Sequence, residues 1–479
     1  MSRLRSPFGA ELNLRSQLLF LDSPPGQPRD LVTAALSWHY RYLHESSHWA
    51  RYHGSSIGVL LTLLRRTRDS LATYLLSQLS PAEQAAAAAA RAGGEPLLSL
   101  QGGALAGTDL DSLSQDWIDL LCTYQMLIDP GPSVVETMTR EGMARALTVT
   151  WQQSAGEGMF PGTVPDVIVT GPGTCVHVDG ALLTTRLLFE CAAVLDELYP
   201  QALGALRPFT DPSLMRMLGH TLTGEYGIPY RLARRLAGRY IGPDVVHALI
   251  DFALNPVVPG LHPGGAVVKW AELDPSTRFL HAARTLSRRP VELESVPATA
   301  ATVASCHEQW EAETGLRIGR VGTDLTDLST LREAARRPAH LVEALPNATL
   351  VYAARLHQER AETLHTISHF GLNFVGEGAL RFVNPDSFGH EGNWWLFPPL
   401  RVIEDEYCWP SERMDQDDAT NLLVGAAVSA ALDDVLYGVG PLHIGHLPLA
   451  VLRSPGELAG LNNILRSIIR MNIGWDRPQ

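Results

Sequence analysis

Residues 38–54, WHYRYLHESSHWARYHG, decide the fold that we expect. From residue 30 to residue 53 the chain contains no glycine or proline, and Leu36, Leu43 and Trp49 give it an apolar side. A long stretch of this kind that stops at a glycine is typical of a packed helix, and Gly54 supplies the stop. We therefore predict a buried helix over residues 30–53.

This predicted helix carries the motif His44-Glu45-Ser46-Ser47-His48, which is HExxH. Residues four apart lie about 40° apart around a helix and one turn along it, so both imidazoles can reach one metal ion. Glu45 lies about 100° from His44, beside the metal, where it can act as base toward a water. The alternative is a pair of hydrogen-bonded helix histidines with an exposed glutamate.

Two further histidines lie close in sequence but at the wrong angle. His39 is nine residues before His48, and His53 is nine residues after His44, about 180° around the helix in each case. We expect both to be core or supporting residues. The longer motif HExxHxxGxxH would need histidine at 54, where this chain has Gly54. The third ligand should therefore come from another element.

A carboxylate on a second helix is the usual complement to two histidines, and Glu190 is the best candidate. It lies in the apolar run GALLTTRLLFECAAVL, residues 180–195, where a buried carboxylate is costly unless it is paired or bound to metal. The alternatives are an ion pair with Arg186 or simple exposure. Reserve ligands are Glu225, Glu197 and Asp196.

With HESSH followed by a distant helical glutamate, the chain resembles the zincin-like proteins, specifically the gluzincins. Residues 30–60 and 180–255 also resemble poorly characterised bacterial HExxH proteins. The resemblance implies that His44, His48 and Glu190 are metal ligands and that Glu45 is the catalytic carboxylate. The spacing departs from that of gluzincins, because 142 residues separate His48 from Glu190.

Two further patterns are weaker signals of chemistry. Glu362, His365 and His369 share one helical face and suggest a second metal site or a substrate-binding face, against the alternative of a structural helix surface. Residues 54–58, GSSIG, match GxSxG, but the pattern marks a nucleophile elbow only after a strand. Here a helix precedes it, so we expect a helix–helix turn with Ser55 or Ser56 as N-cap.

Periodicity elsewhere predicts a mainly α fold (α+β): a zincin-like helical core with small β hairpins and a mostly helical second region. The expected domains are 1–254, which binds metal, and 276–479, with a β region at 379–408. The proline- and glycine-rich segment 255–275 is the expected boundary. A hairpin is expected over 167–178, with helix from Gly180 onward. Ser80-Pro81-Ala82-Glu83 predicts a capping box.

Composition sets limits on function and location. The 479-residue chain has a net charge of −13, which disfavours binding to nucleic acid or to an anionic membrane. Its five cysteines are scattered, so a disulfide framework is not expected, and a reducing compartment is favoured. No apolar run is long enough to span a membrane, and the N-terminus lacks the features of a signal peptide. We expect a cytoplasmic, bacterial protein.

Three functions follow from these features. The first is a zinc hydrolase that acts on a peptide or a small-molecule amide. The second is a non-haem Fe(II)/2-oxoglutarate-dependent hydroxylase of a peptide, because two histidines and one carboxylate also describe that iron site. In it, Arg186 would bind the cosubstrate carboxylate. The third is a zincin-like binding protein without turnover. The sequence indicates no oligomeric state.

Overall fold

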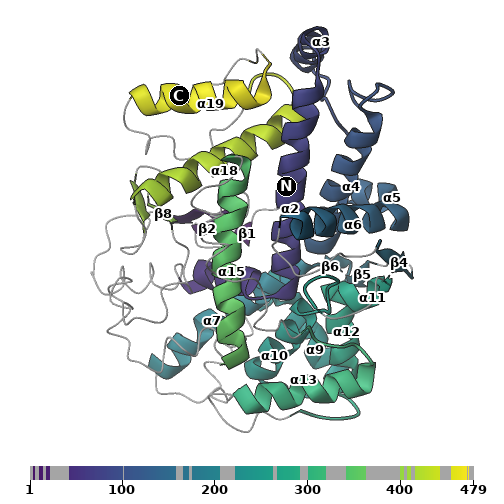
Figure 1. Cartoon of the computed structure of the whole chain (residues 1–479). Helices are drawn as coiled ribbons and strands as arrows, with labels where there is room; N and C mark the ends of the chain where they lie inside the picture. The colour runs from purple at the N-terminus through teal and green to yellow at the C-terminus, as the bar shows by residue number, and fades with distance from the viewer. Residues whose placement is uncertain are drawn as a thin grey trace.

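The computed structural model shows a mainly helical protein, as the sequence predicts (Figure 1). It describes the backbone of residues 4–5, 10–13, 18–21, 43–100, 102–157, 166–171, 175–204, 222–262, 267–291, 300–319, 341–362, 400–403, 407–410, 416–442, 455–471 and 473. Among these residues, no helix is long and apolar enough to cross a membrane.

The described helices agree well with the periodic segments. Residues 43–53 are helical, and residues 30–42 of the predicted helix lie outside the described part of the chain. The Ser80 capping box is confirmed, with both of its hydrogen bonds present. The other helices are α2 (Ser56–Gln78), α3 (Pro81–Ala92), α4 (Asp111–Ile128), α5 (Pro132–Thr137), α6 (Arg140–Gly156), α7 (Thr185–Gly204), η1 (Glu225–Gly227), α9 (Ile228–Ala237), α10 (Pro243–Leu254), α11 (Trp270–Leu273), α12 (Pro275–Thr285), α13 (Ala300–Thr314), η2 (Leu341–Glu343), α15 (Ala344–Glu362), α18 (Gln416–Tyr437) and α19 (Pro455–Ile469).

The described strands form three small sheets. One sheet has the order β1-β2-β3-β8-β9, in which β3 and β8 run parallel and join the start of the chain to residues 400–410. The other two sheets are the pairs β4-β7 and β5-β6. The strands are β1 (Leu4–Arg5), β2 (Ala10–Asn13), β3 (Leu18–Leu21), β4 (Ile168–Thr170), β5 (Val176–Val178), β6 (Ala181–Leu183), β7 (Val267–Lys269), β8 (Leu400–Ile403) and β9 (Tyr407–Pro410).

The predicted hairpin over residues 167–178 is wrong, because its two strands do not pair with each other. Strand β4 pairs in parallel with β7, about a hundred residues away, whereas β5 pairs with β6 across Asp179-Gly180. Both turn residues have positive φ, 51° and 82°, which is the backbone of a two-residue hairpin loop and explains an Asp-Gly sequence there. Helix α7 therefore begins at Thr185 rather than at Gly180, with the Thr184 hydroxyl accepting from the Leu187 N–H.

A tight turn fixes the helix over residues 43–53 against α2. Ser55 is the N-cap of α2, and its hydroxyl accepts from the Gly58 N–H at 3.2 Å. A Cβ at position 58 would lie 1.4 Å from the Tyr52 carbonyl oxygen, so only glycine allows this approach. The GxSxG segment is thus a helix–helix turn, as predicted.

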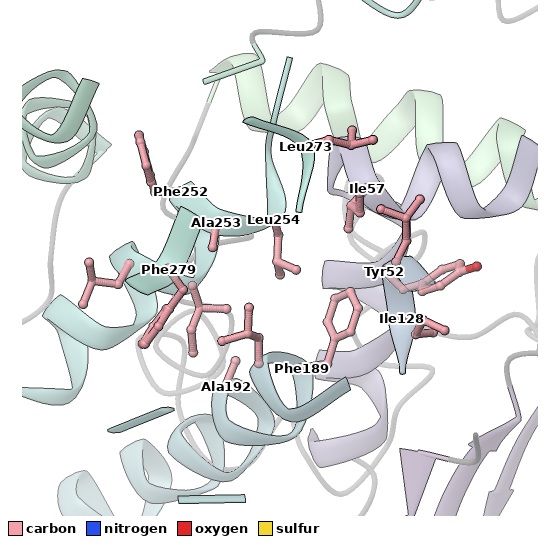
Figure 2. Packing of buried hydrophobic residues seen from close by; sticks show 14 of the residues in the cluster. Tyr52, Ile57, Ile128, Phe189, Ala192, Phe252, Ala253, Leu254, Leu273 and Phe279 are labelled. Carbon is pink, nitrogen blue, oxygen red and sulfur yellow. The ribbon is translucent and has the colours of Figure 1, made fainter. Parts of the chain in front are cut away.

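The first hydrophobic cluster surrounds the helix over residues 43–53. It includes Tyr52 from this helix, Phe189 from α7 and Phe252 from α10, all fully or almost fully buried. Figure 2 shows Phe189 next to Tyr52, and their ring centroids are 6.2 Å apart. This apolar packing holds α7 against the HExxH helix.

A second cluster joins α2, α3 and α4 to α18 and α19, and thus combines residues from both predicted domains. The predicted boundary segment 255–275 contains β7 and α11, and its Val258, Trp270 and Leu273 belong to the first cluster. Neither cluster coincides with the expected division at 255–275, and the domain boundaries stay a prediction. Residues 379–399 of the expected β region lie outside the described residues, while β8 and β9 follow directly.

Candidate metal centre

His44 and His48 lie side by side on the helix over residues 43–53, as the HExxH spacing requires. Their ring centroids are 4.7 Å apart, and the rings are nearly perpendicular, at 83°. Both side chains are completely buried. Ligand atoms of His44, Glu45 and His48 lie within 4.8 Å of one another, which within the described chain is the one such group of three.

Glu190 from α7 lies between the two imidazoles. Its Oε2 atom is 3.4 Å from His44 Nε2 and 3.6 Å from His48 Nε2. These distances exceed the usual length of a hydrogen bond. Two ligand atoms bound at 2.0–2.1 Å to a tetrahedral zinc ion lie about 3.3 Å apart, so each of these two distances from Glu190 is close to that between ligands of a shared metal.

The unpaired polar atoms of these side chains also favour a shared metal. Within the described part of the chain, His44 Nε2, both nitrogens of His48 and both carboxylate oxygens of Glu190 are buried without a hydrogen-bond partner. Polar atoms that are buried unpaired cost free energy, and a carboxylate costs more than a neutral group. One metal ion bound by these side chains would remove most of that cost. The residues present therefore fit a metal.

Electrostatics hold two of the expected ligands, Glu190 and His48, in the forms that bind metal. Burial acts to raise the pKa of Glu190, but the neighbouring His48 and His44 outweigh it and lower this pKa to about 2. Glu190 is thus ionised at neutral pH. Burial lowers the pKa of His48, so its imidazole is neutral. An ionised carboxylate and a neutral imidazole are the protonation states that coordinate metal.

Glu197, one heptad after Glu190 on α7, lies on the other side of His44. Its Oε1 atom accepts a hydrogen bond from His44 Nδ1. Burial acts to lower the pKa of His44, but Glu197 above all, together with Glu190, raises it well above 6.5, so a metal ion would have to displace a proton from this ring. A carboxylate on Nδ1 fixes the tautomer that leaves Nε2 for a metal. The sequence placed Glu197 among the reserve ligands; its geometry is that of a supporting group.

Glu45 and Glu190 compete for the role of third ligand. Glu45 belongs to the group within 4.8 Å, whereas Glu190 contacts each imidazole separately. Because Glu197 occupies His44 Nδ1, a metal can approach this ring only at Nε2, and Nε2 is the atom that Glu190 faces. We therefore keep Glu190 as the expected ligand and Glu45 as the expected base. Glu45 is completely buried beside them.

Asp196, the other reserve ligand on α7, is engaged elsewhere. Its Oδ2 atom accepts from Ser47 Oγ at 2.7 Å and from Arg51 Nη1, and its Oδ1 atom accepts from Arg51 Nη2 at 3.3 Å. Arg51 Nη2 also donates to Nδ1 of His247 on α10, at 3.1 Å. The sequence motifs did not single out Arg51 or His247. The sequence feature that could have indicated Arg51 is its helical spacing, because Ser47 and Arg51 share the helical face of His44.

Arg186 lies one turn before Glu190 on α7 but does not form an ion pair with it. Its Nε atom donates to Asp129 Oδ2 and its Nη2 atom to Glu225 Oε1, each at 3.0 Å. Glu225, the first reserve ligand, is 57% exposed in this ion pair. A 2-oxoglutarate carboxylate would have to compete with both acids for the guanidinium.

The remaining predicted residues lie away from this cluster or outside the described residues. His53 is buried against Trp49, with ring centroids 4.2 Å apart, and burial lowers its pKa to about 3. Glu362 is the last residue of α15, and its side chain lies outside the described residues. His39, His365 and His369 lie outside them as well.

Comparisons with protein-family models, with curated proteins and with solved structures found no match to this chain. The resemblance to gluzincins therefore stays a prediction, and the geometry of the cluster carries the functional argument.

Proposed function

We propose that the chain is a metal-dependent enzyme, with zinc bound by His44, His48 and Glu190, that hydrolyses an amide bond in a peptide or small molecule. The observation that carries the proposal is the position of Glu190 Oε2, 3.4 and 3.6 Å from two imidazole nitrogens that have no other partner among the described residues.

In this proposal zinc, when bound, polarises the amide carbonyl and lowers the pKa of a nearby water. Glu45 takes a proton from the attacking water and delivers it to the leaving nitrogen, so that one side chain acts first as base and then as acid. His44 is held in its ligand tautomer by Glu197. Burial of these side chains strengthens every charge interaction among them.

The test is zinc-dependent cleavage of a peptide library, followed by mass spectrometry. We expect new termini with the zinc-loaded protein, none after chelation, and recovery when zinc is restored. The matched control is the His48→Ala variant treated with zinc in the same way, which should show no cleavage. Cleavage that survives both chelation and His48→Ala would contradict the proposal.

A second candidate is an Fe(II)/2-oxoglutarate-dependent hydroxylase. Its support is a pair of histidines with one carboxylate, Glu190, which lies one turn after Arg186 on α7, and the Arg186 side chain is 19% exposed. Such an enzyme would couple oxidation of a peptide C–H bond by O₂ to decarboxylation of 2-oxoglutarate to succinate. Its test is succinate formation by the anaerobically iron-loaded protein when it is supplied with 2-oxoglutarate and a peptide library and then exposed to air. The pairing of Arg186 with Asp129 and Glu225 makes us place this candidate second.

We also propose a reducing compartment such as the cytoplasm. Four of the five cysteines, Cys122, Cys175, Cys191 and Cys306, are free thiols, and the side chain of Cys408 lies outside the described residues. Burial raises the pKa of Cys122 and of Cys191 to about 12, so both stay protonated and unreactive.

A further inference from the structure

The HExxH helix and α7 meet at a second polar contact beside the metal centre. Arg51 and Ser47 reach from the HExxH helix to Asp196 on α7, and Arg51 reaches on to His247 on α10. Arg51 is 4% exposed, and Asp196 and His247 are completely buried. We call Ser47, Arg51, Asp196 and His247 the anchor.

The anchor is interleaved with the expected ligands along both helices. Ser47 directly precedes His48, and Arg51 follows it by three residues. On α7, Asp196 directly precedes Glu197, which holds His44. A shift of α7 along the HExxH helix would therefore break the anchor and move Glu190 and Glu197 together.

The bonding of the anchor differs from that of the metal-facing atoms. Both oxygens of Asp196 accept hydrogen bonds from the anchor, whereas Glu190 has no such partner among the described residues. Arg51 only donates, so His247 Nδ1 accepts and the neutral ring carries its proton on Nε2, 3.5 Å from Asp196 Oδ1. The anchor can thus form without metal.

Stability alone does not account for a buried anchor of this kind. Apolar side chains of similar volume often stabilise a fold as well as a buried ion pair does. What the planar guanidinium adds is a fixed orientation, because two nitrogens must face two carboxylate oxygens at once. The anchor therefore specifies how α7 lies on the HExxH helix.

We propose that Arg51 and Asp196 are positioning residues that hold Glu190 and Glu197 at ligand spacing before metal binds. This inference rests on the proposed metal site. It predicts that the anchor affects metal affinity as well as folding. A purely structural ion pair would affect folding alone.

The chain offers a matched control pair. Arg68 of α2 donates through Nη2 to Asp433 of α18, at 2.7 and 2.9 Å from its two oxygens. Both side chains are 5% exposed, like those of the anchor. Helices α2 and α18 meet near the C-terminal half of α2, away from α7 (Figure 1).

The experiment measures the zinc dissociation constant by competition with a chromophoric chelator, and unfolding by urea, in the full-length protein. We expect Asp196→Asn to weaken zinc binding about 10- to 100-fold, the range seen when a supporting group of a metal site is lost. Asp433→Asn should change it less than about twofold, although both variants lose a buried ion pair.

A double variant keeps the test decisive if Asp196→Asn does not fold. Arg51→Met with Asp196→Leu replaces the ion pair by apolar groups, so it should fold yet bind zinc at least about tenfold more weakly. Wild-type affinity in that double variant would overturn the positioning role alone. A wild-type protein that binds no zinc would overturn the proposed function, and this inference with it.

Discussion

The metal centre and the ion-pair network between α2 and α18 are both buried polar contacts between helices, but they differ in how their acids are satisfied. In the network, Asp69 accepts from Arg68 and Ser429, and Asp433 accepts from Arg68 at both oxygens. At the metal centre, Glu190 faces two imidazoles at 3.4 and 3.6 Å and accepts no hydrogen bond from the described residues.

This difference distinguishes a structural contact from a candidate site. The network supplies a cation and a hydroxyl to its two acids, whose oxygens are all paired. The metal centre combines an acid with two histidines, of which His48 is neutral, at distances that leave room for an ion. Burial and charge are common to both contacts, and Arg68 Nε in the network also lacks a partner, so what separates them is an acid whose oxygens accept no hydrogen bond from the described residues.

The largest expected effect separates the base from the ligands. Glu45→Gln keeps shape and hydrogen bonding but removes the proton acceptor. We expect full metal content and a loss of turnover of about 10²- to 10⁴-fold, measured as cleavage of the peptide library. Near-normal cleavage would reject the hydrolase mechanism and leave the metal site intact. In a hydroxylase, where no water needs to lose a proton, the same change should have a milder effect on succinate formation. Loss of metal would instead make Glu45 a ligand.

The next effect compares Glu190 with Glu225, the first reserve ligand. Glu190→Ala should weaken zinc binding by more than about 100-fold, since it removes a direct ligand rather than a supporting group. Glu225→Ala is the control, because Glu225 is 57% exposed and pairs with Arg186. Its zinc dissociation constant should stay within about twofold of the wild-type value. The reverse pattern would transfer the ligand role to Glu225.

Glu197→Gln should have a smaller effect, about 10- to 100-fold on zinc affinity, because the amide still contacts His44 but no longer supports its Nδ1 proton as a carboxylate does. The chelator competition used for the other variants measures it. Glu343 of η2 is a suitable control, since it is buried beside Arg66 in another part of the fold. An equal change in Glu343→Gln would show that the loss is general rather than local.

The smallest expected effect concerns how stability depends on pH. The direction of this dependence should reverse when metal is bound. The raised pKa of His44 means that, without metal, its contribution to stability is present below pH 6.5 and is lost as pH rises through the folded-state pKa. Zinc requires the neutral ring, so the stabilisation by zinc should instead grow as pH rises. Thermal unfolding of both forms from pH 6 to 9 measures this, and parallel curves would contradict it.

Local patterns in the sequence account for the helices and for half of the site. HExxH places His44 and His48 on one face, and the apolar run around Glu190 marks a carboxylate that needs a partner. The anchor and the supporting role of Glu197 escaped prediction because their partners are about 150 residues away in sequence. The pairing of β4 with β7 escaped it for the same reason. The Asp179-Gly180 turn, by contrast, was readable from sequence as a hairpin signal.

The central claim is that one ion joins His44, His48 and Glu190. Its most direct test is metal analysis of the wild-type protein purified without oxygen or chelators, beside His44→Ala and His48→Ala. We predict one transition metal per wild-type chain, with zinc favouring the hydrolase and iron the hydroxylase, and almost none in either variant. A wild-type protein without metal, or variants that keep a full complement, would contradict the account.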